Sequence, residues 1–323
     1  MSQNQTNQQR QRGRPKLNET AATSVAELLG FVRKHQALTR LELEKISGFG
    51  RAVVADRLAL LSELGLAHEN ETGISGGGRV PRMVSFSKNR AVLVVASIDQ
   101  SSISVALSDL TGKLTAQHHE PGDLGLDPSD GADRMITLIR LMLSRQTKLP
   151  ELWGISISVP GPIGPSENGS PLTSTPDFLP GWNESKLVER LIAEFSVPIW
   201  LMPSVNTMTV GELHGGTSEN NDCMLFIKTG KRFTAGLVYE GRPYKGATGA
   251  VGLIGQLPAT HEGILGTLDS LAGAEFIEQA ALREARNGTS EQLTDLLNRG
   301  GELTLNEICQ AAQLGDTVCV SII

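Results

Sequence analysis

The spacing of apolar residues changes near residue 90, and this change constrains the fold more than any other feature of the sequence. Before it, apolar residues recur at the i, i+3, i+4, i+7 spacing of a helix that buries one face, as in Val25, Leu28, Leu29 and Val32. After it, "AVLVVASIDQSSISVALSDL" reads as two strands joined by a turn. Strand and helix patterns then alternate, which predicts an α/β domain.

The first part of the chain has the pattern of three short helices followed by a hairpin. Ser24 with Glu27, and Thr39 with Glu42, have the spacing of capping boxes at the starts of the first two helices. The third helix, "RAVVADRLALLSELG", ends at Gly65. "LAHENETGISGGGRVPRMVSF" then reads as a strand, a Gly-rich loop and a strand. This is the plan of a winged helix-turn-helix, whose third helix enters the DNA major groove, although a generic three-helix subdomain has the same spacing.

Charge is distributed unevenly along the chain. The net charge is −6, but residues 1–90 hold 14 of the 29 Lys and Arg and 8 of the 35 Asp and Glu, a net of +6. The remainder holds 15 basic and 27 acidic residues, a net of −12. A basic segment on an acidic body indicates that the amino-terminal part faces nucleic acid, and it favours the winged helix over the generic alternative.

The first 18 residues are rich in Gln, Asn and Arg and are expected to be disordered when free. Within them, "RGRPK" matches the core of an AT-hook, in which arginines enter a narrow A·T minor groove. We therefore predict DNA contacts by Arg12, Gly13, Arg14 and Pro15. Nonspecific contact with phosphates is the alternative.

The predicted third helix supplies candidates for reading bases. With its apolar residues in the core, the residues left to face the groove or its edges are Arg51, Ala52, Ala55 and Arg57. Arg51, early in the helix, is expected to read guanine, and Arg57 to meet a phosphate.

Three further residues are candidates for positioning the protein on DNA. Thr39 serves either as a phosphate contact or only as a helix cap. Arg79 and Arg82, in the predicted wing, should reach the backbone or the minor groove. Such contacts carry little sequence information.

Length and composition indicate an ordinary globular protein with two domains. The 323 residues are too many for one typical compact domain. No run is long enough to cross a bilayer, and the polar first 20 residues do not form a signal peptide. Cys223, Cys309 and Cys319 lack CxxC spacing, so no disulfide framework is expected. A cytoplasmic, nucleoid-associated location fits these features.

With these motifs the chain resembles the ROK family of repressors and sugar kinases, and specifically its transcriptional repressors. The similarity covers roughly residues 20–320; its most specific stretches are "GISISVPGPI", "LPGW", "NTMTVGE", "GLVYEGRPYKGATGAVGLIG" and "LDSLAG". The sequence patterns thus divide the chain into a basic arm (1–18), a winged helix-turn-helix (19–88) and an α/β domain (89–323), and the resemblance implies that the last is actin-like and ribonuclease-H-like.

The resemblance also bears on partners and completeness. It implies a homodimer or higher homo-oligomer that binds double-stranded DNA, with no membrane partner. ROK repressors usually continue past the point matching Ile323. The α/β domain is therefore expected to be incomplete at its carboxyl end, either because the chain is naturally short or because it is a fragment.

This chain departs from the motifs with which ROK kinases hold ATP and sugar. The first phosphate loop of the kinases, Asp-Ile-Gly-Gly-Thr, is residues 97–101, "SIDQS", where the charge of Asp99 would repel phosphate. The kinases' catalytic aspartate is Ser204, which cannot act as a base without another base beside it. Leu253 and Gln256 replace the carboxylate and the histidine of Gly-Glu-Ile-Gly-His.

The zinc motif of the family has lost its thiols. Cys-x-Cys-Gly-x-x-Gly-Cys maps onto residues 260–267, "THEGILGT", which leaves no tetrahedral site of nitrogen and sulfur ligands. His261 and Glu262 are interpreted as a surface pair rather than as a different metal site. Because four parts of the kinase machinery are altered together, we predict no catalytic residue, no cofactor, no metal and no enzyme activity.

The resemblance leaves open whether the second domain binds a small effector. In related repressors a sugar or sugar phosphate does so. Asn206 is the family sugar contact that clearly survives, and Asp269 stands where the family has a glutamate. These two residues are either structural remnants or part of an altered pocket with Ser204, His261 or Glu262, since a sugar needs several converging hydrogen bonds.

Three functions follow as alternatives. The leading interpretation is a transcription regulator, a repressor, of sugar metabolism with a catalytically dead kinase-like domain. A second is a DNA-tethered factor whose acidic body binds another protein and no small molecule. A remote third is an active ATP-dependent sugar kinase.

Overall fold

The computed structural model describes residues 19–35, 37–70, 82–99, 102–121, 128–146, 148, 150–161, 163–164, 172–173, 186–216, 222–230, 232–246, 251–261 and 263–323. The predicted contact residues Arg12, Gly13, Arg14, Pro15, Arg79 and Glu262 lie outside these ranges. The chain divides into two compact units. One comprises residues 1–94, 106–118 and 139–154, and the other residues 95–105, 119–138 and 155–323.

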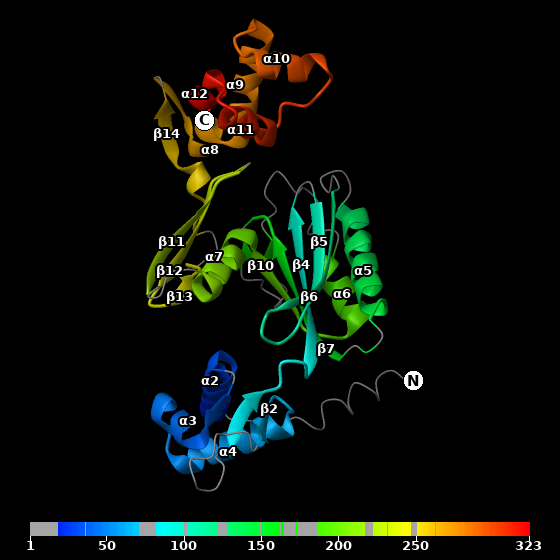
Figure 1. The fold of residues 1–323 in the computed structure, drawn as a ribbon, viewed down its shortest axis with the longest axis vertical. Coiled ribbons are helices and arrows are strands. Elements are labelled where there is room, and N and C mark those ends of the chain that lie inside the picture. Colours follow the sequence, from blue (N-terminus) through cyan, green and yellow to red (C-terminus); the bar gives the residue numbers. More distant parts are fainter. Residues whose placement is uncertain are drawn as a thin grey trace. The chain divides into compact units, whose positions relative to one another are not determined.

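The first unit starts with three helices and a small antiparallel sheet (Figure 1). The helices are α2 (Glu19–His35), α3 (Arg40–Ser47) and α4 (Arg51–Glu63). The strands, in sheet order, are β1 (Ala37–Thr39), β3 (Met83–Phe86) and β2 (Ala67–Asn70), with both pairings antiparallel. The three predicted helices and the two hairpin strands are present, and β1 adds a third strand that the sequence pattern did not reveal.

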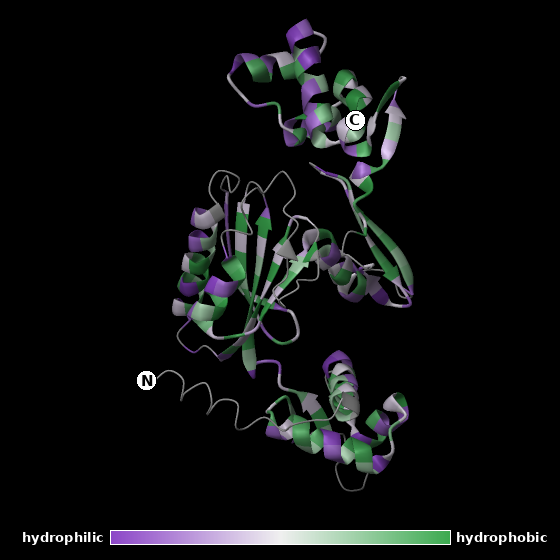
Figure 2. Cartoon of the chain, turned by 180° about the vertical axis from the view of Figure 1, so that it is seen from behind, coloured by the Kyte–Doolittle hydropathy of each residue, from purple (hydrophilic) through white to green (hydrophobic). Residues whose placement is uncertain are grey.

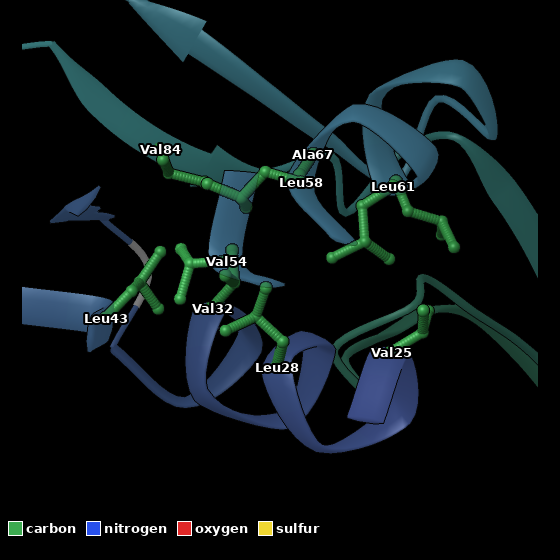
Figure 3. Close-up of a cluster of buried hydrophobic side chains, with 10 residues drawn as sticks. Val25, Leu28, Val32, Leu43, Val54, Leu58, Leu61, Ala67 and Val84 are labelled. Carbon is green, nitrogen blue, oxygen red and sulfur yellow. The ribbon is translucent and has the colours of Figure 1, made fainter. Parts of the chain in front are cut away.

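These elements pack around one apolar core (Figure 3). The side chains that meet there come from every helix and from the sheet, and include Val25, Leu28, Val32, Leu43, Val54, Leu58, Leu61, Ala67 and Val84. Burying one aliphatic side chain contributes roughly 1.5–3 kcal/mol. The shared core therefore stabilises helices such as α3, which is too short to be stable alone.

The start of one helix follows the sequence prediction and the start of another does not. At α3, the Thr39 hydroxyl accepts the Glu42 N–H at 3.2 Å, and the Glu42 carboxylate accepts the Thr39 N–H at 2.7 Å. The predicted cap at Ser24 is wrong, because α2 already begins at Glu19. The Ser24 hydroxyl instead lies inside the helix and donates to the Ala21 carbonyl at 3.0 Å.

A five-stranded sheet with accompanying helices confirms the α/β domain that the sequence pattern predicts. Its strands, in spatial order, are β10 (Ile199–Pro203), β7 (Glu151–Val159), β4 (Ala91–Asp99), β5 (Ser102–Ser108) and β6 (Leu114–Pro121). Helices α5 (Pro128–Ser144) and α6 (Leu187–Phe195) accompany it. β7 and β10 are parallel, and α6 lies in the crossover connection that a parallel pair needs. The central strands are mostly apolar (Figure 2), and fully buried positions largely alternate with half-buried ones along β4 and β7.

A second sheet and a helix follow β10 in the second unit. Helix α7 (Ser204–Gly215) packs against β12 (Thr234–Tyr239), which lies between β11 (Cys223–Lys228) and β13 (Arg242–Tyr244). The approach is close, because a Cβ atom at Gly236 would meet the Thr209 Oγ1 atom at 1.7 Å. The short pair β8 (Ile163–Gly164) and β9 (Leu172–Thr173) also belongs to this unit.

The carboxyl-terminal elements are a hairpin and a group of helices. They are η1 (Ile254–Gln256), β14 (Pro258–His261), β15 (Ile264–Thr267), α8 (Leu268–Ala272), α9 (Ala274–Asn287), α10 (Glu291–Asn298), α11 (Leu305–Gln313) and α12 (Thr317–Ile322). The last four helices share a core around Ala281, Ile308 and Cys319. Within the described residues, no helix is both long and apolar enough to span a membrane.

Candidate functional sites

Helix α4 presents an exposed face opposite its buried residues. Val54, Leu58 and Leu61 enter the core, while the exposed side chains are Arg51, Ala52, Val53, Asp56 and Ala59 among others. The N-cap residue Gly50 offers no side chain to the first turn. The N–H groups of that turn, and the positive end of the helix dipole, are therefore open to an anionic or hydrogen-bonding partner.

The predicted DNA contacts on α4 differ in where their side chains lie. Arg51 and Ala52 are exposed, and Ala55 is half-buried. Arg57 turns back into the protein, where its Nε atom donates to the Ser24 hydroxyl of α2 at 2.9 Å. Its guanidinium also pairs with Asp56 at 2.5 Å. The described contacts therefore engage Arg57 within the first unit.

The other described candidates lie outside α4. The Thr39 hydroxyl forms the α3 cap, and Arg82 precedes β3 and is exposed.

Val53 and Asp56 are exposed residues of α4 that sequence reasoning missed. A valine directly before the core residue Val54 resembles a second core residue in sequence, and only the helix orientation shows that it faces outward.

A recess in the second unit brings together residues from segments far apart in the chain. It is open to solvent and is lined by Gly161, Pro203, Ser204, Val205, Asn206, Thr234, Val251, Gly252 and Leu253. None of these described lining residues is charged. Gly252 has φ 92°, and a Cβ atom there would meet the Ala235 carbonyl at 1.7 Å, so this wall requires glycine.

Asn206 is buried in this recess without a side-chain hydrogen bond to any part of the chain that the structure describes. It is 8% exposed, and its side-chain amide bonds to none of the described residues. The nearby buried Thr209, by contrast, donates to the Val205 carbonyl at 2.7 Å. A buried polar group without a partner costs roughly 1–3 kcal/mol. Because native proteins pair such groups with water or a ligand, the Asn206 amide is available to a small polar molecule.

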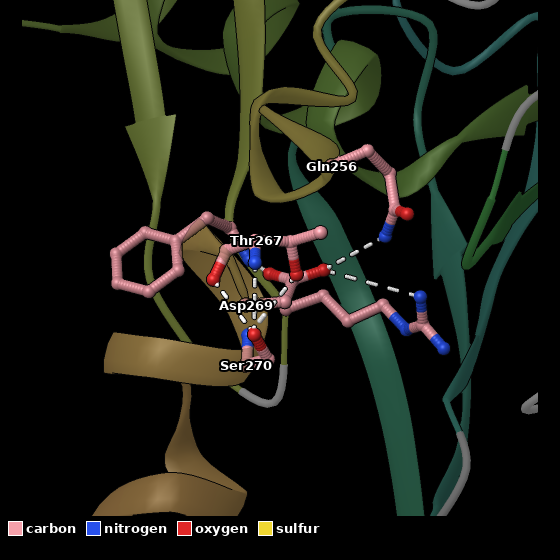
Figure 4. A network of polar contacts seen from close by, with 6 residues as sticks. Gln256, Thr267, Asp269 and Ser270 are labelled. Atoms are coloured by element: carbon pink, nitrogen blue, oxygen red, sulfur yellow. Dashed lines mark hydrogen bonds and ion pairs between the residues drawn. The ribbon is translucent and has the colours of Figure 1, made fainter. Parts of the chain in front are cut away.

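Asp269 is held by the protein itself (Figure 4). Its carboxylate accepts the Phe233 N–H at 2.7 Å and the Gln256 side-chain amide at 3.3 Å, and it lies 3.9 Å from the Arg232 guanidinium. These contacts tie α8 to η1 and to the segment before β12. They favour a structural role for Asp269, which does not line the recess around Asn206.

His261 also lies apart from the described recess. Its exposed ring stands edge-on to Phe276, with the ring centroids 6.2 Å apart. Among the described residues, no three His, Cys, Asp or Glu side chains are grouped to hold a metal ion. The structure therefore brings together Ser204 and Asn206 of the predicted ligand set, and it places Asp269 and His261 elsewhere.

The α/β part of the chain matches a known family. The model of the ROK family matches residues 97–323, which is most of the chain. The chain belongs to the ROK family. The resemblance drawn from the sequence motifs is thereby confirmed.

The curated relatives of this ROK protein include sugar repressors. It is 25% identical over 237 residues to the xylose repressor of Bacillus spizizenii, an alignment that spans 73% of this chain and 60% of the repressor. It is 24% identical over 305 residues to the DNA-binding transcriptional dual regulator NagC of Escherichia coli, spanning 92% and 73% of the two chains. The chain thus covers only part of the length of these relatives.

Solved structures support the fold. A ROK family transcriptional regulator, a homolog of the E. coli MLC protein, matches with a TM-score of 0.77 and 20% identity over 94% of this chain and 77% of that one. A ROK family glucokinase from Streptomyces griseus, solved with glucose and AMPPNP, matches with a TM-score of 0.57 and 16% identity over 72% and 74%. The mixed α/β ROK fold predicted from sequence is confirmed.

Proposed function

We propose that this ROK protein is a DNA-binding transcription regulator, a repressor, that responds to a sugar or sugar phosphate. Residues 19–88 form its winged helix-turn-helix and residues 89–323 its sensor domain. The observation that carries the proposal is the uncapped, exposed first turn of α4 on a well-packed three-helix core. The repressor relatives support the same function.

DNA is held by α4 with its first turn leading into the major groove. Arg51 is exposed at that turn and can form two hydrogen bonds with a guanine edge. Arg82, which precedes β3, and Arg79, of the wing predicted from sequence, contact the backbone, and residues 12–15 enter a minor groove. Two copies of the chain then read a two-fold site whose halves lie one helical turn apart.

The effector binds in the recess around Asn206. The buried amide of Asn206 and the hydroxyl of Ser204 provide polar contacts there, and the first turn of α7 provides N–H groups. A ligand can change DNA affinity only if it prefers one of two conformations of the protein. The sugar effector is therefore expected to stabilise the form with lower DNA affinity.

The same recess argues against a kinase. Phosphoryl transfer to a sugar needs a base near the hydroxyl that attacks, and the described lining residues include no titratable side chain. Ser204 stands where a carboxylate would be needed. We propose that the α/β domain binds its ligand without turning over ATP, and measurable ATP consumption with any sugar would overturn this part of the proposal.

Thermal unfolding of the full chain with a panel of sugars and sugar phosphates tests the effector. A ligand at 100 times its dissociation constant stabilises the protein by about 2.7 kcal/mol. One member of the panel should raise the melting temperature and release bound DNA. If no member does either while DNA binding is intact, the protein-binding alternative gains support instead.

A further inference from the structure

The exposed face of α4 offers few hydrogen-bond donors for reading bases. Beyond Arg51, its described exposed side chains in the first turns are Ala52, Val53 and Asp56. Alanine and valine cannot donate, and an ionised aspartate only accepts. Arg57, which could have donated, is engaged by Ser24 and Asp56. Donation to base edges by this face therefore depends on Arg51 and on the first-turn N–H groups, and its remaining first-turn side chains offer apolar contact.

The position of Asp56 limits how α4 approaches DNA. Its side chain is 71% exposed, one turn beyond Ala52, and its carboxylate can form no hydrogen bond with a phosphate, because both groups only accept. The first turn carries Arg51 and no acidic residue. This distribution favours an approach in which the first turn enters the groove and the turn containing Asp56 stays farther from the backbone.

Val53 lies on this first turn as a large apolar side chain that is 39% exposed, next to the fully buried Val54. The apolar feature of the major groove is the methyl group of thymine, so a valine inserted there gains most from contact with that methyl. We propose that Val53 is a specificity-determining residue that reads a thymine methyl group, beside the guanine read by Arg51. This proposal rests on the proposed DNA-binding function.

Replacing thymine by deoxyuridine removes only the methyl group and so tests the contact directly. The binding site is first selected by the full-length protein from a library of random-sequence duplexes. Each thymine of the selected site is then replaced singly. At one thymine in each half-site, the replacement should weaken binding of the unmodified protein about fourfold, the effect of one buried methyl group.

The variant Val53→Ala completes the test. It should bind the thymine site about fourfold more weakly and should not distinguish deoxyuridine from thymine at that position. Val53→Thr, which keeps the shape and replaces one methyl by a hydroxyl, should lose part of the discrimination. Leu225→Ala, at a residue 61% exposed on β11, is the matched control and should behave as the unmodified protein.

Two results would overturn the proposal. One is a deoxyuridine effect that is absent at every position, or that persists unchanged in a folded Val53→Ala variant. The other is a library that yields no preferred sequence, which would remove the proposed DNA-reading function and this inference together. Melting temperatures of both Val53 variants show whether either has merely unfolded.

Discussion

Helices α4 and α7 start in the same way but in different surroundings. Both N-caps, Gly50 and Pro203, make no side-chain hydrogen bond to the first turn. At α4 the first residues are exposed, whereas at α7 Val205 and Asn206 are buried within a recess. The same backbone feature can therefore serve a long polymer at one helix and a small molecule at the other.

An uncapped start is not by itself a binding site. Helices α6 and α9 also lack a side-chain hydrogen bond from their N-cap residues, Lys186 and Gly273. Neither N-cap is part of the recess or of the exposed face of α4. What sets α4 and α7 apart is a second property: α4 carries the exposed Arg51, and α7 carries the buried Asn206, whose amide has no partner among the described residues. The two sites should accordingly respond separately to mutation.

Removing core volume under α4 should have the largest effect. Leu61 is 0% exposed, so Leu61→Ala should cost about 2–5 kcal/mol and abolish DNA binding through loss of the three-helix core. Chemical denaturation measures the first and DNA titration the second. Ligand-induced stabilisation should survive, since the recess belongs to the other unit. Loss of both activities would mean that the two sites are not separable.

Replacing the two arginines of α4 should have different effects on DNA affinity and on stability. Arg51→Ala should weaken binding to the selected DNA by about 1–3 kcal/mol, because a bidentate base contact is lost, with little change in stability. Arg57→Ala should lower stability by about 1 kcal/mol through loss of the Ser24 contact, with a smaller effect on DNA. DNA titration and thermal unfolding of both variants check this. The reverse ranking on DNA would contradict the assignment.

Replacing the amide of Asn206 should separate the recess from α4. Asn206→Leu should stabilise the ligand-free protein by about 1 kcal/mol, because a buried polar group without a partner is removed. It should also abolish ligand-induced stabilisation and leave DNA affinity unchanged. Denaturation curves with and without ligand provide the measurement. A destabilised variant would indicate that the amide has a structural partner.

The cap of α3 should give the smallest effect, visible through pH. The N–H and hydroxyl of Thr39 hydrogen-bond to Glu42 and lower the pKa of its carboxyl, as does the charge of Lys45. A lowered pKa in the folded state means that the stabilisation is present above the unfolded pKa and is lost as pH falls through the folded one. The stability difference between the unmodified protein and Glu42→Gln should therefore shrink on acidification below about pH 4. A constant difference would show that the charge of Glu42 does not matter.

Local sequence predicted elements and caps where the deciding contacts are near in sequence. The Thr39–Glu42 box and the core positions of α4 are examples. Ser24 was misassigned because α2 extends upstream to Glu19, so its hydroxyl bonds within the helix.

The candidate sites depended on contacts that sequence spacing does not reveal. The engagement of Arg57 by Ser24 joins residues 33 positions apart, and the Asp269–Phe233 bond joins residues 36 apart. The recess likewise combines residues after β7 with residues before η1. Ser204 and Asn206 could be named from the family motif, but the absence of a described partner for Asn206 required the structure.

Sequencing the genomic DNA retained by the full-length protein, in parallel with Arg51→Ala, tests the central claim most directly. Both proteins are incubated with fragmented genomic DNA in moderate salt and captured. If α4 reads sequence through Arg51, the unmodified protein should enrich a few two-fold symmetric sites sharply, and Arg51→Ala should lose that enrichment. Uniform recovery that disappears with added salt and is unchanged by Arg51→Ala would contradict this claim, because binding would then be electrostatic alone.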